Sequence, residues 1–261
     1  MNIKILVAFH KDAPMPKDKN LYMPILVGAD KNFNGQKGFQ LDNEGINISS
    51  KNLNYNELTA IYWAWKNLKN TDAIGLVHYR RLFSKSHQRL LDNVLTSGQV
   101  EELLNKAPVI LPRKRNYYIE TIKSHYLHSH YQEPLDVTRE VISEKFPNYV
   151  QAFDEVMDSK SAHMFNMFIM KTDYFDKYCE WLFAILFEVE KRVDISSYSI
   201  QEARVFGYLS ELLMDVWIKT NHVDYVECNW IQIGDRQLVK KAIGFIKRKL
   251  VSNVGKDVTH Y

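Results

Sequence analysis

Residues 55–83, YNELTAIYWAWKNLKNTDAIGLVHYRRLF, are the most informative stretch of the sequence. The first half has the aromatic and apolar spacing of an amphipathic helix, and residues 73–79 form an apolar run typical of a buried strand. Arg80 and Arg81 directly follow that strand in the sequence. Open α/β sheets bind ligands beyond the carboxyl ends of their strands, and adjacent guanidinium groups suit phosphate oxygens. We therefore expect an anionic ligand here, with solvated or carboxylate-paired arginines as the alternative.

Apolar runs and helical patterns alternate through the rest of the chain. Strands are predicted at 3–10, 22–27, 108–112, 162–170 and 223–228, and helices from residue 54 and at 99–105, 119–130, 137–146, 149–157, 173–192 and 201–220. Residues 31–54 lack periodicity and predict a long loop. This alternation is typical of an α/β fold with a mixed, mostly parallel sheet flanked by helices. Because no repeat or linker interrupts it, residues 1–233 are expected to form a single domain.

The composition is that of an ordinary globular protein, with 46% hydrophobic and 25% charged residues. Two cysteines, Cys179 and Cys228, give no disulfide framework and no zinc pattern, and they fit a reducing compartment. The N-terminus lacks the apolar core of a signal peptide, and no apolar run is long enough to span a membrane. We therefore expect a cytoplasmic protein.

Residues 234–261 form a predicted basic tail. Seven lysines and arginines and no acidic residue lie within 236–256, interspersed with apolar residues at roughly helical spacing. Such a basic amphipathic helix can bind an anionic membrane surface, which would make the protein peripheral at the inner membrane face. A tail that packs on the domain is the main alternative, and nucleic-acid binding is a weaker one.

Three predicted strands end in polar clusters, which are His10-Lys11-Asp12, His78-Tyr79-Arg80-Arg81 and Arg113-Lys114-Arg115. If these ends meet at one edge of the sheet, they form a site for a small anionic ligand. The glycine-rich signatures of dinucleotide-binding folds and P-loops are absent from the sequence. Asp-x-Asp is absent too, and the nearest acidic pair is Asp42-x-Glu44 in the long loop, where such pairs are usually solvated.

Further polar residues could carry chemistry. Glu211 borders an apolar helix stripe, where desolvation raises a carboxyl pKa unless Arg204 or another cation pairs with it, and this favours a general base. The alternative is a structural ion pair that locks this helix to the HYRR region (78–81). Asn166, in the predicted strand after His163, needs a partner, which is either a neighbouring loop or a sugar hydroxyl. The histidines of SHYLHSHY (124–131) have no evident fourth ligand, so we favour structural or substrate contacts over a metal site.

Five blocks of the sequence carry a family resemblance. They are NISSKNLNYNELTAIYWAWKN, DAIGLVHYRRLF, PVILPRKRNYYIETIKSHYLHSH, HMFNMFIMKTDYFDKYCEWLF and RVFGYLSELLMDVWI, in this order over nearly the whole chain. Together they resemble the bacterial capsular and exopolysaccharide biosynthesis glycosyltransferase family, formerly a domain of unknown function. The resemblance implies a GT-A-like fold and the transfer of a hexose, galactofuranose in some members, from a UDP sugar. The implied acceptor is a glycan linked to polyprenyl diphosphate, in capsule, O-antigen or exopolysaccharide synthesis.

The resemblance also implies roles for single residues. The implied nucleotide-sugar contacts are Phe9, His10, Lys11, Asn47, Ser49, Asn52, His78, Tyr79, Arg80 and Arg81. The implied sugar or acceptor contacts are Asn166, Arg113, His125, His130 and Arg204. Glu211 is the implied base that deprotonates the acceptor, and Asp42 and His163 are further catalytic candidates.

Arg80 and Arg81 lie where GT-A enzymes generally place Asp-x-Asp and its metal ion. We therefore expect the two arginines to neutralise the departing diphosphate directly, with no metal site, and a requirement for Mn or Mg is the alternative. Two readings other than catalysis remain open. One is a non-catalytic sugar-nucleotide or glycan binding partner of another transferase, and the other is a nucleic-acid-associated protein. We favour the transferase, with no nucleic-acid partner.

Overall fold

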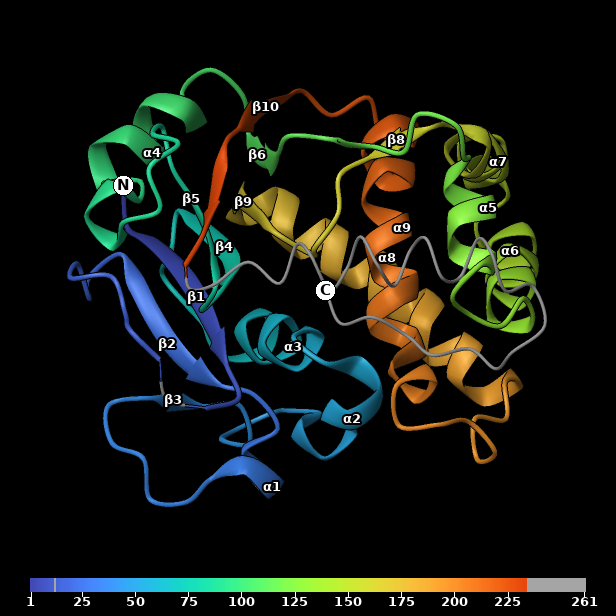
Figure 1. Cartoon of the computed structure of the whole chain (residues 1–261), viewed down its shortest axis with the longest axis horizontal. Coiled ribbons are helices and arrows are strands. Elements are labelled where there is room, and N and C mark those ends of the chain that lie inside the picture. The colour runs from blue at the N-terminus through green and yellow to red at the C-terminus, as the bar shows by residue number, and fades with distance from the viewer. Residues whose placement is uncertain (12, 234–261) are drawn as a thin grey trace.

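The computed structural model describes residues 1–11 and 13–233, so Asp12 and the predicted basic tail lie outside the described residues. A mixed sheet with the strand order β10-β6-β9-β4-β1-β2-β3 forms the centre of the fold (Figure 1). These strands are β1 (Ile3–Phe9), β2 (Tyr22–Leu26), β3 (Gln40–Leu41), β4 (Ala73–His78), β6 (Val109–Pro112), β9 (Phe168–Lys171) and β10 (Tyr225–Cys228). Two short strands, β5 (Arg81–Phe83) and β11 (Trp230–Gln232), extend the sheet beside β4, and β7 (Arg115–Asn116) pairs with β8 (Ser161–Ala162).

The strand directions bring the predicted ligand-binding ends together. β1 runs parallel to β2 and to β4. β9 is antiparallel to both β4 and β6, so β6 runs in the same direction as β4. The carboxyl ends of β1, β4 and β6 therefore lie at one edge of the sheet. The predicted α/β fold, with a mixed and mostly parallel sheet, is confirmed.

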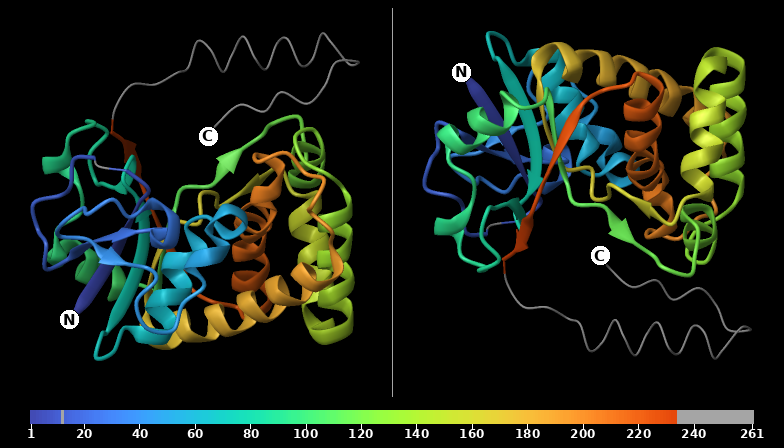
Figure 2. Two further views of the ribbon diagram at one scale, coloured as in Figure 1. Left: turned by 90° about the horizontal axis from the view of Figure 1, so that it is seen from below. Right: turned by 90° about the horizontal axis from the view of Figure 1, so that it is seen from above.

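The sheet is buried on both faces. Successive side chains of a strand point to opposite sides, and both sets belong to a hydrophobic core. Leu6 and Leu76 belong to the core on one face, which is shared with α3 (Leu58–Asn67), α8 (Thr172–Arg192) and α9 (Val205–Thr220). Ile5 and Val77 belong to the core on the other face, which is shared with α4 (Ser97–Leu104). Figure 2 shows α6 (Glu133–Lys145) and α7 (Val150–Asp158) as an outer layer against α8 and α9.

The predicted strand at 162–170 is wrong, because β8 ends at Ala162 and β9 begins at Phe168. Between them lies a largely buried loop in which Phe165 has φ 80° and Asn166 has φ 52°. Phe165 and Met167 of this loop are buried, so its composition is that of a buried strand while its backbone is not extended. This difference matters because the loop borders the candidate site.

The predicted helix from residue 54 is two helices, α2 (Asn52–Tyr55) and α3, interrupted at Asn56 with φ 51°. Asparagine tolerates this left-handed backbone better than most residues. The predicted loop at 31–54 also holds β3, a 3-10 turn (Ser49–Lys51) and the end of α1 (Ala29–Asn32), and the helix predicted at 119–130 is limited to α5 (Ile122–Leu127). A 3-10 turn (Glu202–Arg204) leads into α9. Among the described residues, no helix combines the length and apolarity that crossing a membrane requires.

Candidate active site

A cleft of about 340 Å³ opens at the carboxyl ends of β1 and β4. Its walls come from five parts of the chain: the end of β1, Val27 after β2, the α2–α3 junction, the turn between β4 and β5, and residues 200–211 at the start of α9. The predicted site residues that line it are His10, Asn52, His78, Tyr79, Arg80, Arg81, Arg204 and Glu211. Folding thus brings together residues that lie far apart in the sequence.

Three arginines line the cleft: Arg80 and Arg81 from the β4–β5 turn, and Arg204, the residue before α9. The guanidinium of Arg81 lies 4.5 Å from the centre of the Phe165 ring, and that of Arg80 lies 5.1 Å from the centre of the Tyr79 ring. Arg204 donates from Nε to Oδ1 of Asn56 at 2.8 Å. Burial lowers the pKa of Arg81, which remains a cation, so this charge acts in a partly dehydrated setting where it is only weakly screened.

Two carboxylates face these cations. Glu57, at the start of α3, and Glu211, on α9, both line the cleft. Burial raises the pKa of Glu211 to about 7, and the negative charge of Glu57 acts in the same direction. A hydrogen bond with the backbone of Phe165 and the charges of Arg81 and Arg115 oppose this rise. A carboxyl group with this pKa can accept a proton near neutral pH.

His10 and Tyr79 form an aromatic wall of the cleft. The His10 ring lies edge-on to Tyr79 at 5.2 Å, and Tyr79 stacks on Phe9 at 5.6 Å. Phe9 itself is only 1% exposed, so it supports Tyr79 from behind and does not reach the cleft. Burial lowers the pKa of His10, with the charges of Lys11 and Arg80 adding to the effect, which keeps the imidazole neutral near pH 7.

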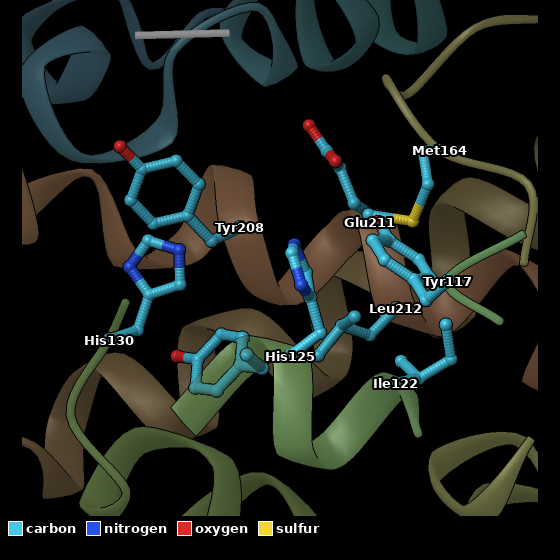
Figure 3. A pocket seen from close by; sticks show the side chains of 9 residues that line it. Tyr117, Ile122, His125, His130, Met164, Tyr208, Glu211 and Leu212 are labelled. Carbon is cyan, nitrogen blue, oxygen red and sulfur yellow. The ribbon is translucent and has the colours of Figure 1, made fainter. Parts of the chain in front are cut away.

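A small chamber of about 30 Å³ adjoins the cleft behind Glu211 and Tyr208, which line both cavities. Figure 3 shows the His130 ring against the Tyr208 ring and His125 between Tyr208 and Tyr117. His130 Nδ1 lies 3.2 Å from Glu202 Oε2 and its ring stacks on Tyr208 at 4.1 Å. Both histidines predicted to contact the acceptor are thus placed next to the candidate base.

Several predicted site residues lie outside the cleft and the chamber. Asp42 is 0% exposed and accepts hydrogen bonds from the backbone of Gly28 and Ala29 and from the hydroxyls of Ser49 and Thr59. The solvated Asp42 expected from its loop position is therefore wrong: this carboxylate ties the loop to α1 and α3, and it does not line the cleft. Ser49 belongs to the same hydrogen-bond network, because its hydroxyl donates to Asp42 and accepts from the backbone of Asp30.

Asn47, Lys11 and Arg113 also lie outside the lining of the cleft. The Asn47 amide donates to the backbone of Asn43 and Gly45 within its own loop. Lys11 and Arg113 are exposed. These three residues are therefore no part of the site as we define it by its lining.

His163 belongs to a separate buried cluster. Its Nδ1 lies 2.5 Å from Asp215 Oδ1, and its Nε2 lies 3.2 Å from Glu227 Oε1. The imidazole is 2% exposed and lines neither the cleft nor the chamber. It joins the loop after β8 to α9 and β10, which gives it a structural setting rather than a position at the cleft.

Glu57, Asn56 and Tyr208 also line the cleft, and sequence reasoning missed them. Glu57 reads as an ordinary acidic residue in the first turn of a helix, where the helix dipole favours it. A conceivable signal was the i, i+3 spacing of Tyr208 and Glu211, which puts both side chains on one face of α9. Within residues 1–11 and 13–233, no group of three or more His, Cys, Asp or Glu side chains is arranged to hold a metal ion.

The sheet topology and the cleft at its strand ends define the class of α/β proteins with a site beyond the carboxyl ends of the strands. A family described as a domain of unknown function, DUF4422, matches residues 4–222, and the chain belongs to this family. The apo structure of WbbM, described as a bifunctional glycosyltransferase, matches with a TM-score of 0.82 and 25% sequence identity over 90% of this chain. The match covers 46% of that protein, so this chain spans less than half of its length. No curated protein matches the sequence.

Proposed function

We propose that this protein transfers a hexose, galactofuranose being one candidate, from a UDP sugar to a glycan acceptor. The observation that supports this function best is the cleft itself, where arginines gather beside a carboxyl group whose pKa is raised to about 7. The fold shared with a bifunctional glycosyltransferase supports the same reaction class. The chemistry needs a cationic site for the leaving diphosphate and a base for the acceptor, and the arginines and Glu211 are our candidates for these two roles.

On the donor side, Arg80, Arg81 and Arg204 would face the diphosphate. Negative charge develops on the leaving oxygen as the bond to the anomeric carbon breaks, and fixed cations stabilise that charge. The half-buried Arg81 suits this role best, because its stacking on Phe165 fixes its position. His10 and Tyr79 would contact the uracil or ribose, and Asn52 would extend that wall.

On the acceptor side, Glu211 would take the proton of the attacking hydroxyl. The hydroxyl oxygen then bonds to the anomeric carbon while the sugar–diphosphate bond breaks on the opposite face, which inverts the anomeric centre. His125 and His130 line the chamber behind Glu211 and would contact the acceptor sugar. The acceptor we propose is a glycan on polyprenyl diphosphate in capsule, O-antigen or exopolysaccharide synthesis, with the basic tail holding the protein at the membrane.

The first test is the thermal stability of the protein with a panel of UDP sugars, each in manganese and in EDTA. A ligand that binds only the folded state raises the melting temperature. A rise with UDP-galactofuranose, UDP-galactose or UDP-glucose that persists in EDTA supports a donor site built on arginines. A rise that needs manganese keeps the transferase and contradicts the metal-free diphosphate site. No rise with any UDP sugar contradicts the proposed donor class.

A further inference from the structure

Phe165 and Asn166 are consecutive non-glycine residues with positive φ, 80° and 52°. Residues other than glycine rarely adopt this backbone, and phenylalanine least readily of the two. Such conformations persist where the surrounding structure over-determines them, often at functional sites. The contacts of this dipeptide therefore show what holds it.

Phe165 contacts three of the charged or titratable groups of the cleft. Its carbonyl oxygen lies 2.6 Å from His78 Nε2, and the centre of its ring lies 4.5 Å from the Arg81 guanidinium. Its backbone also makes a hydrogen bond with Glu211. One residue thus connects the end of β4, the β4–β5 turn and α9.

Asn166 reaches the other carboxylate. Its Nδ2 donates to Glu57 Oε1 at 2.6 Å and to the carbonyl of Gly207 at 3.2 Å. Its Oδ1 accepts a hydrogen bond from Ser210 at 2.9 Å, and the residue is 6% exposed. Both amide hydrogens are thus engaged by the protein, which disfavours the predicted contact between Asn166 and a sugar hydroxyl.

We infer that Phe165 and Asn166 are positioning residues that hold Glu211 and Glu57, the two carboxylates that line the cleft, in fixed positions. The inference rests on the proposed function, in which Glu211 is the base. Phe165 fixes Glu211 through the backbone, and Asn166 fixes Glu57 through its side chain. The left-handed backbone is what lets two adjacent residues serve two carboxylates on different helices.

The charges around Glu211 show how the position of Glu57 affects the pKa of Glu211. Burial and the charge of Glu57 raise the pKa of Glu211, and the charges of Arg81 and Arg115 lower it. The other titratable or charged residues that line these cavities with it are His10, His78, Tyr79, Arg80 and Arg204 in the cleft and Tyr117, His125, Tyr126, His130 and Tyr208 in the chamber. Glu57 is the acidic group among these, so it is the neighbour that keeps a proton on Glu211 at higher pH.

The test is a direct titration of Glu211 by NMR of isotope-labelled glutamate carboxyl carbons, with the signal assigned by its loss in Glu211→Gln. Glu57→Gln keeps the shape of the side chain and removes the like charge. Asn166→Gly keeps the left-handed backbone, which glycine adopts freely, and removes the donor to Glu57. Asn70→Gly is the matched control, since Asn70 has φ 57° and lies outside the cleft.

We expect Glu57→Gln to lower the pH midpoint of Glu211 by about one unit or more, and Asn166→Gly to lower it in the same direction. Asn70→Gly should leave it unchanged. Unchanged midpoints in both site variants would overturn the inference. If the midpoints shift while the wild-type protein transfers no hexose from any UDP sugar, the positioning role stands and the proposed function fails.

Discussion

Glu211 is the residue on which the proposed chemistry depends most. Its position on α9 exposes it to the cleft while the apolar side chains around it limit its hydration, and this burial is the main cause of its raised pKa. A base with an ordinary carboxyl pKa would be ionised at neutral pH but would bind a proton weakly. The raised pKa makes Glu211 the better proton acceptor.

Glu211→Gln should lower kcat by about 100-fold or more, because the amide cannot take the acceptor proton. The wild-type kcat/KM should fall as the pH drops through about 7, since the base works only when ionised and protonation removes it. Transfer rates over a pH series measure both effects. The control is the thermal shift with the UDP sugar, which the variant should retain. Wild-type rates in the variant would remove Glu211 from catalysis.

Arg81→Ala should lower kcat/KM by about 100-fold, because removing one fixed donor from a site of developing charge has this order of effect. The donor-induced rise in melting temperature should shrink as well. Arg113→Ala is the matched control, since Arg113 is exposed and lies outside the cleft. Equal effects of the two substitutions would show that net charge, rather than the position of Arg81, governs donor binding.

At the scale of elements, the loop before α2 is held by a buried carboxylate. Asp42 accepts from the backbone at the start of α1 and from the Ser49 and Thr59 hydroxyls. This arrangement fixes the loop against α3, and Asn52 and Glu57 on the adjoining segments line the cleft. The Asp42 loop thus supports the wall of the cleft, and its buried carboxylate does not line the cleft.

Asp42→Ala should lower the free energy of unfolding by about 3–5 kcal/mol, because it leaves several buried donors without a partner. Urea denaturation measures this loss. The control Asp30→Ala, at an exposed position on α1, should cost less than about 1 kcal/mol. If Asp42→Ala unfolds like the wild type yet abolishes transfer, Asp42 acts in catalysis and its structural assignment is wrong.

In the whole molecule, the cleft lies at the carboxyl ends of the parallel strands β1 and β4. The acceptor that we propose is linked to a lipid and therefore lies at a membrane. The basic tail is the part of the sequence suited to an anionic surface, with each cation near such a surface adding about 1 kcal/mol. The tail would raise the local concentration of lipid-linked acceptor at the cleft. Its division from residues 1–233 remains a prediction from sequence.

A protein truncated after Ile233 should lose co-sedimentation with anionic liposomes, whereas the full-length protein should bind them at low salt. The reason is that the seven cations of 236–256 are removed together. Added salt should weaken full-length binding, since it screens exposed charges. Neutral liposomes serve as the control. Truncated protein that still sediments fully with anionic liposomes would contradict a membrane role for the tail.

The fold was largely predictable because its signals are local. The apolar run of β1 and β4 and the periodicity of α8 and α9 follow from side-chain burial, which leaves a pattern in the sequence. The strand 162–170 was mispredicted for the same reason: a buried loop and a buried strand share a composition. The short strands β5, β7 and β11 are too brief to leave a pattern at all.

By itself, the sequence determined the α/β class, the position of the arginines after β4 and the resemblance to a family of transferases. Only the tertiary structure decided which residues share the cleft, because that depends on the packing of α9 against the α2–α3 junction. Glu57 and Glu211 line the same cleft, both Asn166 amide hydrogens are bonded within the protein, and Asp42 and His163 lie outside the cleft. Burial and neighbouring charge, which no local pattern encodes, set the chemistry of these groups.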